Sequence, residues 1–364
     1  DFVPPAQEID VTYETGWNLV GLPLDVSNPN YISLFPDAIE ETLYGYQPNG
    51  YVQGDSLFHG NGYWLRFSDE NTTTISGSVL DDLQISLAEG WNLISGITTS
   101  IAVNNILDPS ELIIPGTVYG FDNGYLEAET IEPGYGYWLR SSGEGEITLS
   151  SSSQTTARMV TAQEPENENT LKFGNQTLYF GNNIEVENVL SYSLPPKPPT
   201  GAKDIRFSGD TKLCATDECV IEMVNDEQLI TIGCDINDGE SWEIIPVIAS
   251  GTGWSEAISL SGLDQFIVDS EVEQWILRKS KSTIPNIFAL YPAYPNPFNP
   301  VTTLRYNLPE DAKVTLTVCD LMGREVTQLV NTPQEPGFKS VQWDATDSFG
   351  KPVSAGVYLY QIQA

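Results

Sequence analysis

Catalysis by this chain would depend on very few side chains, because its 364 residues include a single histidine, His59. A Ser-His-Asp triad or a Cys-His pair needs an imidazole base, and here only His59 could supply it. This histidine lies in the stretch 58–62 (FHGNG), whose composition is typical of a surface loop. Paired carboxylates are the other route to hydrolysis, but nothing distinguishes two of the 50 acidic residues. We therefore expect no catalytic residues and interpret the chain as a non-enzyme.

Oxygen ligands suited to a hard cation gather in the stretch 235–240 (DINDGE). Carboxylate and amide oxygens are the ligands that Ca²⁺ prefers, so Asp235, Asn237, Asp238 and Glu240 form a candidate calcium site. The stretch lacks the twelve-residue ligand order of an EF-hand. An ordinary Asn-Asp-Gly β-turn accounts for the same residues. We favour the turn and expect no cofactor, with calcium as the alternative.

The four cysteines predict one disulfide and no zinc site. Cys214 and Cys219 flank a short polar loop, and in an oxidising compartment we expect them to close a small disulfide ring. Cys234 is in phase with the isoleucines of its predicted strand, which is typical of a small buried hydrophobe. Cys319 lies in a different module. Their spacing is not that of a zinc centre.

Two aromatic stretches, 63–66 and 137–140 (both YWLR), offer a candidate ligand-binding surface. In a strand, tryptophan and arginine point to one face while tyrosine and leucine point to the other. If the tryptophans lie on an outer face, they form a stacking platform for sugars with an arginine within cation–π reach. If they face inward they are core residues, which we favour. The candidate ligand-binding residues are Trp64, Arg66, Trp138 and Arg140.

Both aromatic stretches belong to an internal duplication, in which equivalent positions differ by a constant offset: 91 − 17 = 74 and 138 − 64 = 74. Two copies of one module occupy 8–81 and 82–150. His59 corresponds to Pro133 in the second copy, which is further reason to doubt a catalytic role. The matching pairs are GWNL at 16–19 and 90–93, GYWLR at 62–66 and 136–140, and GY at 50–51 and 124–125.

Short runs of alternating apolar and polar residues, bounded by Gly, Asn and Pro, predict an all-β chain. Helical turns are expected only around 31–34 and 101–107. We interpret each repeat as a small β-barrel or sandwich packed against its twin. The polar stretch 151–169 predicts a linker. Residues 170–283 predict an immunoglobulin-like sandwich, interrupted by a rigid extended segment at the proline-rich stretch 195–199.

The C-terminal stretch 290–364 carries a specific series of motifs. The series is YPNPFNP at 294–300, TTLRY at 302–306, DLMGREV at 320–326, WD at 343–344 and GVYLY at 356–360. Order and spacing resemble the type A sorting domain of the bacterial type IX secretion system. That resemblance implies a seven-stranded immunoglobulin-like sandwich at 290–364, related to flagellar hook-cap domains. The family continues into a final basic strand, so this chain is expected to lack the last strand. The preceding β repeats and the 170–207 stretch resemble modules of secreted Bacteroidota proteins.

The resemblance implies export through the periplasm of a Gram-negative bacterium to the medium or the outer-membrane surface, with the type IX machinery as partner. We expect a non-catalytic accessory or structural region attached to upstream domains, because no signal peptide is visible at Asp1. The alternatives are carbohydrate-binding modules of an extracellular hydrolase, with polysaccharide as partner, and a cell-surface adhesin or fibre subunit that contacts neighbouring surface proteins.

The charge narrows the range of partners. The chain has 16 Lys and Arg against 50 Asp and Glu, a net charge of 16 − 50 = −34. Such a field repels phosphate backbones and anionic lipid, so we expect no nucleic-acid partner. Apolar runs fall far short of the roughly 18–20 residues of a membrane span, so none is expected.

Overall fold

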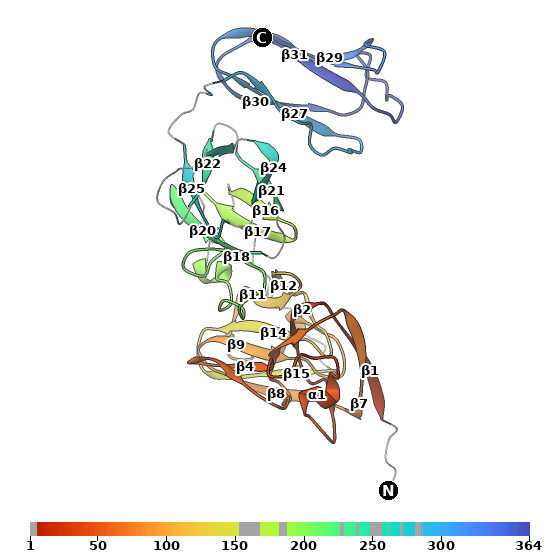
Figure 1. Ribbon diagram of the computed structural model, residues 1–364, viewed down its shortest axis with the longest axis vertical. Coiled ribbons are helices and arrows are strands. Elements are labelled where there is room, and N and C mark those ends of the chain that lie inside the picture. The colour runs from red at the N-terminus through yellow and green to blue at the C-terminus, as the bar shows by residue number, and fades with distance from the viewer. Residues whose placement is uncertain are drawn as a thin grey trace. The chain divides into compact units, whose positions relative to one another are not determined.

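The computed structural model describes residues 6–152, 168–181, 188–225, 229–237, 240–247, 257–260, 262–269, 272–280, 285 and 287–364. Strands dominate these residues (Figure 1), which confirms the all-β prediction. The helical elements among them are α1 (Tyr31–Leu34) and the 3₁₀ turns η1 (Val103–Asn105) and η2 (Val189–Tyr192). The first two lie where the sequence predicts helical turns.

The chain folds as two compact units. The first contains 1–166, 185–213 and 221–228, and the second contains 167–184, 214–220 and 229–364. The two repeats therefore share one unit, and the predicted 170–283 module is divided between the units. Most of the predicted linker, 153–167, lies outside the described residues.

The four-stranded sheets of the two repeats have the same strand order. In the first repeat this sheet runs β2-β6-β4-β5 and β1 pairs with β7; in the second it runs β9-β14-β11-β12 and β8 pairs with β15. The short strands differ: β3 also pairs with β7 in the first repeat, whereas β10 pairs with β13 in the second. The strands of the first repeat are β1 (Gln7–Tyr13), β2 (Gly16–Val20), β3 (Leu24–Asp25), β4 (Tyr44–Gln47), β5 (Gly50–Gln53), β6 (Tyr63–Phe67) and β7 (Asn71–Val79). Those of the second are β8 (Asp82–Leu87), β9 (Gly90–Ser95), β10 (Ile101–Ala102), β11 (Ile113–Phe121), β12 (Tyr125–Glu127), β13 (Thr130–Ile131), β14 (Gly136–Ser141) and β15 (Gly145–Ser150).

The register is also repeated. Trp17 pairs with Arg66 across β2 and β6, as Trp91 pairs with Arg140 across β9 and β14. The asparagine of each GWNL motif closes the turn before its strand: the Asn18 side chain accepts from the amide of residue 14, 3.0 Å away, and Asn92 accepts from that of residue 88, 2.9 Å away. The tryptophan and asparagine of GWNL and the arginine of YWLR thus have the same structural roles in both copies.

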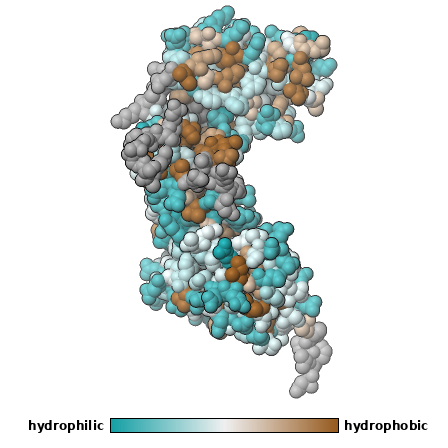
Figure 2. Space-filling model, in the orientation of Figure 1, coloured by the Kyte–Doolittle hydropathy of each residue, from teal (hydrophilic) through white to brown (hydrophobic). Residues whose placement is uncertain are grey.

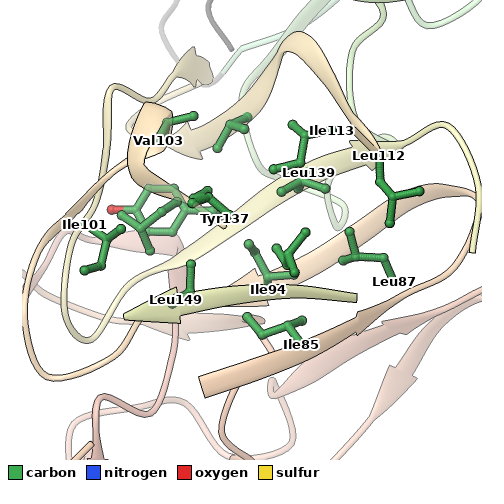
Figure 3. Packing of buried hydrophobic residues seen from close by; sticks show 14 of the residues in the cluster. Ile85, Leu87, Ile94, Ile101, Val103, Leu112, Ile113, Tyr137, Leu139 and Leu149 are labelled. Carbon is green, nitrogen blue, oxygen red and sulfur yellow. The ribbon is translucent and has the colours of Figure 1, made fainter. Parts of the chain in front are cut away.

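Each repeat encloses its own apolar core between one face of its four-stranded sheet and a smaller sheet, which is β1-β7-β3 in the first repeat and the two-stranded ribbon β8-β15 in the second. Figure 3 shows this core in the second repeat, where Ile85 and Leu149 from the ribbon meet Tyr137 and Leu139 from β14. In the first repeat Tyr63 and Leu65 of β6 have the corresponding role. The tyrosines and leucines of the YWLR stretches therefore face these cores, as the strand alternation predicts.

The second unit contains strands in the orders β17-β16-β21-β24 and β25-β22-β23, with Phe180 of the first set meeting Trp242 of the second edge-on at 4.9 Å. These strands are β16 (Asn169–Phe173), β17 (Gln176–Phe180), β21 (Leu229–Asp235), β22 (Trp242–Pro246), β23 (Ile258–Leu260), β24 (Leu263–Asp269) and β25 (Gln274–Lys279). Between them in sequence come β18 (Asp204–Phe207), β19 (Leu213–Cys214) and β20 (Glu218–Val224).

The C-terminal residues form two three-stranded sheets, ordered β26-β27-β30 and β29-β28-β31, around one apolar core. Val314, Leu316 and Val318 are fully buried in it, which confirms the alternation predicted for this strand. The strands are β26 (Ala289–Leu290), β27 (Thr302–Leu308), β28 (Ala312–Cys319), β29 (Glu325–Gln334), β30 (Gly337–Trp343) and β31 (Leu359–Gln363).

Polar residues cover most of the visible surface, although hydrophobic patches reach it among the C-terminal strands at the top of Figure 2. Leu321, Met322 and Phe349 are largely exposed apolar residues of these strands' connections. Single exposed apolar residues are ordinary on protein surfaces. The described part of the chain contains no helix with the length and apolar character of a membrane span.

The repeats approach each other through backbone at two equivalent places. The amide of Gly21 donates to the carbonyl of Gly134 at 2.9 Å, and that of Ser95 donates to the carbonyl of Gly60 at 3.1 Å. Adding 74 to 21 and to 60 gives 95 and 134, so each contact is the image of the other. The two copies are related by an approximate two-fold axis, which is the geometry of a symmetric dimer fused into one chain.

Alanine at Gly62 or Gly136 should destabilise this interface. A Cβ at Gly62 would lie 2.4 Å from the carbonyl oxygen of Ile94, and one at Gly136 would lie 2.9 Å from that of Val20. Backbone cannot move aside as a side chain can, so we expect each change to lower the free energy of unfolding by about 1–3 kcal/mol in urea titrations. Gly143→Ala is the matched control, since its Cβ meets no atom within 4 Å. Equal stability of all three variants would contradict this account of the interface.

Candidate functional site

The faces of the two sheets that turn away from the repeats' own cores meet each other in a cluster of aromatic residues, which we call the aromatic seam. Each sheet is thus buried on both faces where it lies at the seam. The seam consists of Leu19, Trp64, Leu93, Tyr119, Tyr125, Trp138 and Leu194, with Trp17, Tyr44, Tyr46, Tyr51, Trp91 and Phe121 half-buried around them.

The centre of the seam is reciprocal. Trp64 of the first repeat meets Phe121 of the second edge-on, with ring centroids 4.7 Å apart. Trp138 of the second repeat meets Tyr46 of the first in the same way, also at 4.7 Å. Edge-to-face contacts at this distance are favourable because the positive ring edge meets the negative ring face. Each tryptophan is therefore held by aromatic residues of the other copy.

This packing contradicts the hypothesis that Trp64 and Trp138 form a stacking platform for sugars. Both tryptophans have 0% exposure, because each copy covers the tryptophan of the other. A sugar cannot stack on a ring that has no exposed face. Trp64 and Trp138 are core residues, which is the interpretation that we favoured from the sequence.

The arginines of the same candidate site contact other rings. Arg66 lies over the ring of Trp17 with its guanidinium carbon 5.9 Å from the centroid, and Arg140 lies over Trp91 at 5.7 Å. These distances fit cation–π contacts at the rim of the seam. The structure therefore places the four predicted residues in two symmetric sets, but with the tryptophans inside and the arginines at the edge.

One side of the seam is closed by residues 194–200 (LPPKPPT), which we call the proline strap. Leu194 is buried within the seam, and the rest of the strap forms no helix and no strand. Three seam side chains donate hydrogen bonds to strap carbonyls. Tyr125 Oη donates to Pro196 at 2.7 Å, Tyr51 Oη to Lys197 at 2.9 Å and Trp17 Nε1 to Thr200 at 3.1 Å.

Arg206 holds the start of the strap in place through the carbonyl of Pro195. Its side chain is fully buried and makes a bidentate pair with Asp204, with both N–O distances 2.7 Å. Its Nη1 donates to the carbonyl of Pro195 and to Asp210, both at 2.8 Å. The guanidinium also lies 5.8 Å from the ring centroid of Tyr125. A planar fork with five donors suits this combination of carboxylate, carbonyl and ring.

Lys212 attaches the same segment to the second repeat. It forms an ion pair with Glu127, and its ammonium lies 5.5 Å from the ring centroid of Tyr119. Segment 185–213 thus joins the repeats' unit through a buried arginine, a lysine and the strap.

Glu240 of the candidate calcium site is occupied by protein donors. Trp242 Nε1 lies 2.8 Å from its carboxylate, Lys279 Nζ 2.9 Å and Asn169 Nδ2 3.0 Å. Although burial opposes it, these hydrogen bonds lower the pKa of Glu240. Asn237 donates its backbone amide to Asn169 Oδ1 at 2.8 Å. Glu240 and Asn237 thus form hydrogen bonds with residues of the neighbouring strands β16, β22 and β25.

The structure describes one of the two remaining members of that site. Asp235 is exposed, and Asp238 lies outside the described residues. Within the described ranges, no group of three or more His, Cys, Asp or Glu side chains has the arrangement of a metal site. Calcium binding here stays a prediction.

The structure joins Cys214 to Cys219 by a disulfide with a Cα separation of 6.3 Å, while Cys234 is free and buried, as the sequence predicts. His59 is half-buried rather than freely exposed, because its Nε2 lies 3.0 Å from the carbonyl oxygen of Leu24. That contact ties its loop to the first repeat.

The proline strap and its partners were not predicted from the sequence as a site. Tyr51 and Tyr125 served there only as evidence of duplication, and Arg206 had no role. The sequence feature that could have predicted this site is a proline-rich stretch in the same chain as a duplicated set of tryptophans and tyrosines. Proline-rich segments commonly dock on aromatic surfaces.

Replacing Arg206 should cost far more than replacing an exposed arginine. Arg206→Leu leaves Asp204 buried without its partner, so we expect a loss of about 3–5 kcal/mol in urea unfolding followed by tryptophan fluorescence. Adding Asp204→Leu should recover part of that loss. The control is Arg324→Leu, whose pair with Asp320 involves an arginine side chain with 76% exposure, so its loss should cost far less than that of Arg206. Similar losses in the two single variants would contradict the role given to Arg206.

The two free cysteines should differ in reactivity. Burial, with a smaller contribution from Asp264, raises the pKa of Cys234 to about 12. Because the thiolate is the reactive form, native alkylation near pH 8 should modify the half-buried Cys319 well before Cys234. Peptide mapping should recover Cys214 and Cys219 as a linked peptide until a reductant is added. Equal alkylation rates at Cys234 and Cys319 would contradict the placement of Cys234.

Comparison with known proteins identifies one module. Residues 300–364 match the family model of the FlgD Ig-like domain. No curated protein matches the chain. The matched residues contain β27 to β31 and their shared core, so this part of the chain is an immunoglobulin-like β-sandwich module of a multidomain, all-β protein.

Proposed function

We propose that this chain is a non-catalytic structural or accessory region of a secreted or cell-surface protein, exported through the type IX secretion system by its C-terminal module. The observation that carries this proposal is the immunoglobulin-like sandwich at 300–364 together with the motif series between 294 and 360. Immunoglobulin-like sandwiches serve many functions, so the export route rests on the motifs rather than on the fold.

Three observations support a non-catalytic role. The aromatic seam, which contains the candidate ligand-binding tryptophans, is filled by the chain itself. Glu240 already accepts three hydrogen bonds, and His59 is engaged with a backbone carbonyl. A catalytic acid or base needs a position from which it can reach a substrate.

The carbohydrate-binding alternative loses the observation on which it was based, since Trp64 and Trp138 are buried. The adhesin or fibre alternative differs from the leading proposal in what the whole protein contacts, namely neighbouring surface proteins. We place the protein at the outer surface of a Gram-negative bacterium or in its medium, reached through the periplasm, with the type IX machinery as its export partner.

Export should depend on the C-terminal module and on the translocon. The test follows the complete natural protein that contains this chain, tagged within its repeats, in its host and in a strain lacking the type IX translocon. We expect it in the medium or on the cell surface of the first strain and in the periplasm of the second. A version lacking everything from residue 290 onward is the control and should stay in the periplasm. Equal secretion by both strains would refute the export route.

The purified chain should turn over none of a panel of glycan, ester and peptide substrates. Turnover that disappears on changing one specific carboxylate would refute the non-catalytic role. Affinity electrophoresis in soluble glycans tests the alternative directly: mobility should match that in gels without glycan, whereas retardation would restore the carbohydrate-binding hypothesis through a surface other than Trp64 and Trp138.

A further inference from the structure

The segment that closes the aromatic seam has the chemistry of a peptide ligand. Of the six residues 195–200 (PPKPPT), four are prolines. Proline has no backbone N–H, so such a segment offers neighbouring molecules carbonyl acceptors and flat apolar rings. Its restricted backbone also loses little entropy when it is bound. A surface that binds it needs aromatic side chains and hydrogen-bond donors placed between them.

The seam supplies both. Its donors are two phenols and one indole, the groups that combine a large apolar surface with a single hydrogen-bond donor. They reach the carbonyls of Pro196, Lys197 and Thr200 at 2.7–3.1 Å. Burial raises the pKa of both Tyr51 and Tyr125, so their hydroxyls stay protonated and able to donate. Aromatic-lined grooves that dock proline-rich segments are a recurring mode of peptide recognition.

The duplication is needed to complete this donor set. Trp17 and Tyr51 come from the first repeat, and Tyr125 comes from the second. Tyr51 and Tyr125 are equivalent residues of the two copies, since 125 − 51 = 74, and they serve adjacent carbonyls. One repeat alone would present only part of the set. The packing of the copies against each other is therefore what creates the surface.

We propose that the aromatic seam is a recognition site for proline-rich extended peptides, and that the proline strap is its ligand within the same chain. Recognition depends on main-chain carbonyls and proline rings. The one charged strap side chain, Lys197, points its ammonium to Glu222 instead, and that pair lies outside the seam. Arg206 has a separate role, because it holds the carbonyl of Pro195 and so positions the strap over the seam.

The test supplies the strap as a separate peptide. In the full chain, replacing Pro195, Pro196, Pro198 and Pro199 by serine should weaken the internal ligand, and it changes none of the side chains that form the seam. The probe is a fluorescein-labelled peptide with the sequence of residues 193–202, followed by anisotropy. We expect saturable binding to this variant and at least about tenfold weaker binding to the wild-type chain, because there the strap competes at a high effective concentration.

Two further comparisons decide whether the seam is the binding site. Adding Tyr51→Phe and Tyr125→Phe to the serine variant should weaken binding at least about tenfold, because both phenol hydrogen bonds to the peptide are lost. Tyr51→Phe also removes the acceptor of the Trp64 indole, so the fold of this variant is compared with that of the serine variant. Tyr46→Phe is the matched control, because Tyr46 belongs to the same seam through its ring contacts with Tyr51 and Trp138 and should leave affinity within about twofold. A peptide with serine in place of its prolines should not bind.

Circular dichroism and tryptophan emission check that each variant is folded. If the fourfold variant does not fold, a milder one with serine at Pro198 and Pro199 only is used, together with the wild-type chain at high peptide concentration. Both should bind with the same dependence on Tyr51 and Tyr125. A folded variant that does not bind the peptide, or that binds it equally well without the two hydroxyls, would overturn the proposal and leave the strap as ordinary core.

Discussion

Mutual burial of Trp64 and Trp138 is the interaction on which the architecture of the repeats depends. Neither copy of the module buries both faces of its own four-stranded sheet, because its smaller sheet covers only one of them. The other face carries a tryptophan in each copy, and full burial of such a side chain contributes roughly 2–3 kcal/mol or more relative to exposure. Packing the two faces together with edge-to-face geometry removes both indoles from water at once. A single repeat would expose this face and is not expected to be stable alone.

The fold class and the equivalence of the repeats are predicted well from the sequence, and for identifiable reasons. The constant offset between the copies recurs in the strand order and in the pairing register, since identical local sequences impose identical alternation and turns. The C-terminal sandwich is predictable because its strands alternate strictly and its motifs are specific. The sequence does not predict that each repeat covers the tryptophan of the other. Alternation shows which residues share a face of a strand, but it does not show whether another module covers that face.

The strap is unpredictable from local sequence for a related reason. Residues 194–200 lie far along the chain from the second YWLR stretch, which ends at Arg140. Every residue has a backbone carbonyl, so the sequence does not reveal which carbonyls accept the seam's hydrogen bonds. The surroundings of Arg206 explain one contact of the strap once the structure is known. A fully buried guanidinium requires a carboxylate and further acceptors nearby, and Asp204, Asp210 and the carbonyl of Pro195 supply them. We predicted a separate module for these residues, whereas their contacts join 185–213 to the repeats.

The two-fold relation between the repeats also limits how the module can be multiplied. An interface made of reciprocal contacts, in which the contact of Gly21 with Gly134 is repeated by that of Ser95 with Gly60, is closed, because both partners have used the same surface on each other. A third copy would find no free face of that kind, unlike a solenoid repeat, which always leaves one end open. A chain with one module alone could bury the same surface only against a second copy of itself. The strap breaks that symmetry, because the equivalent residues Tyr51 and Tyr125 donate to two different carbonyls of one peptide segment. The indole of Trp64 donates to Tyr51, while that of Trp138 has no hydrogen-bond partner among the described residues, so the two halves also differ in the hydrogen bonding of their central indoles.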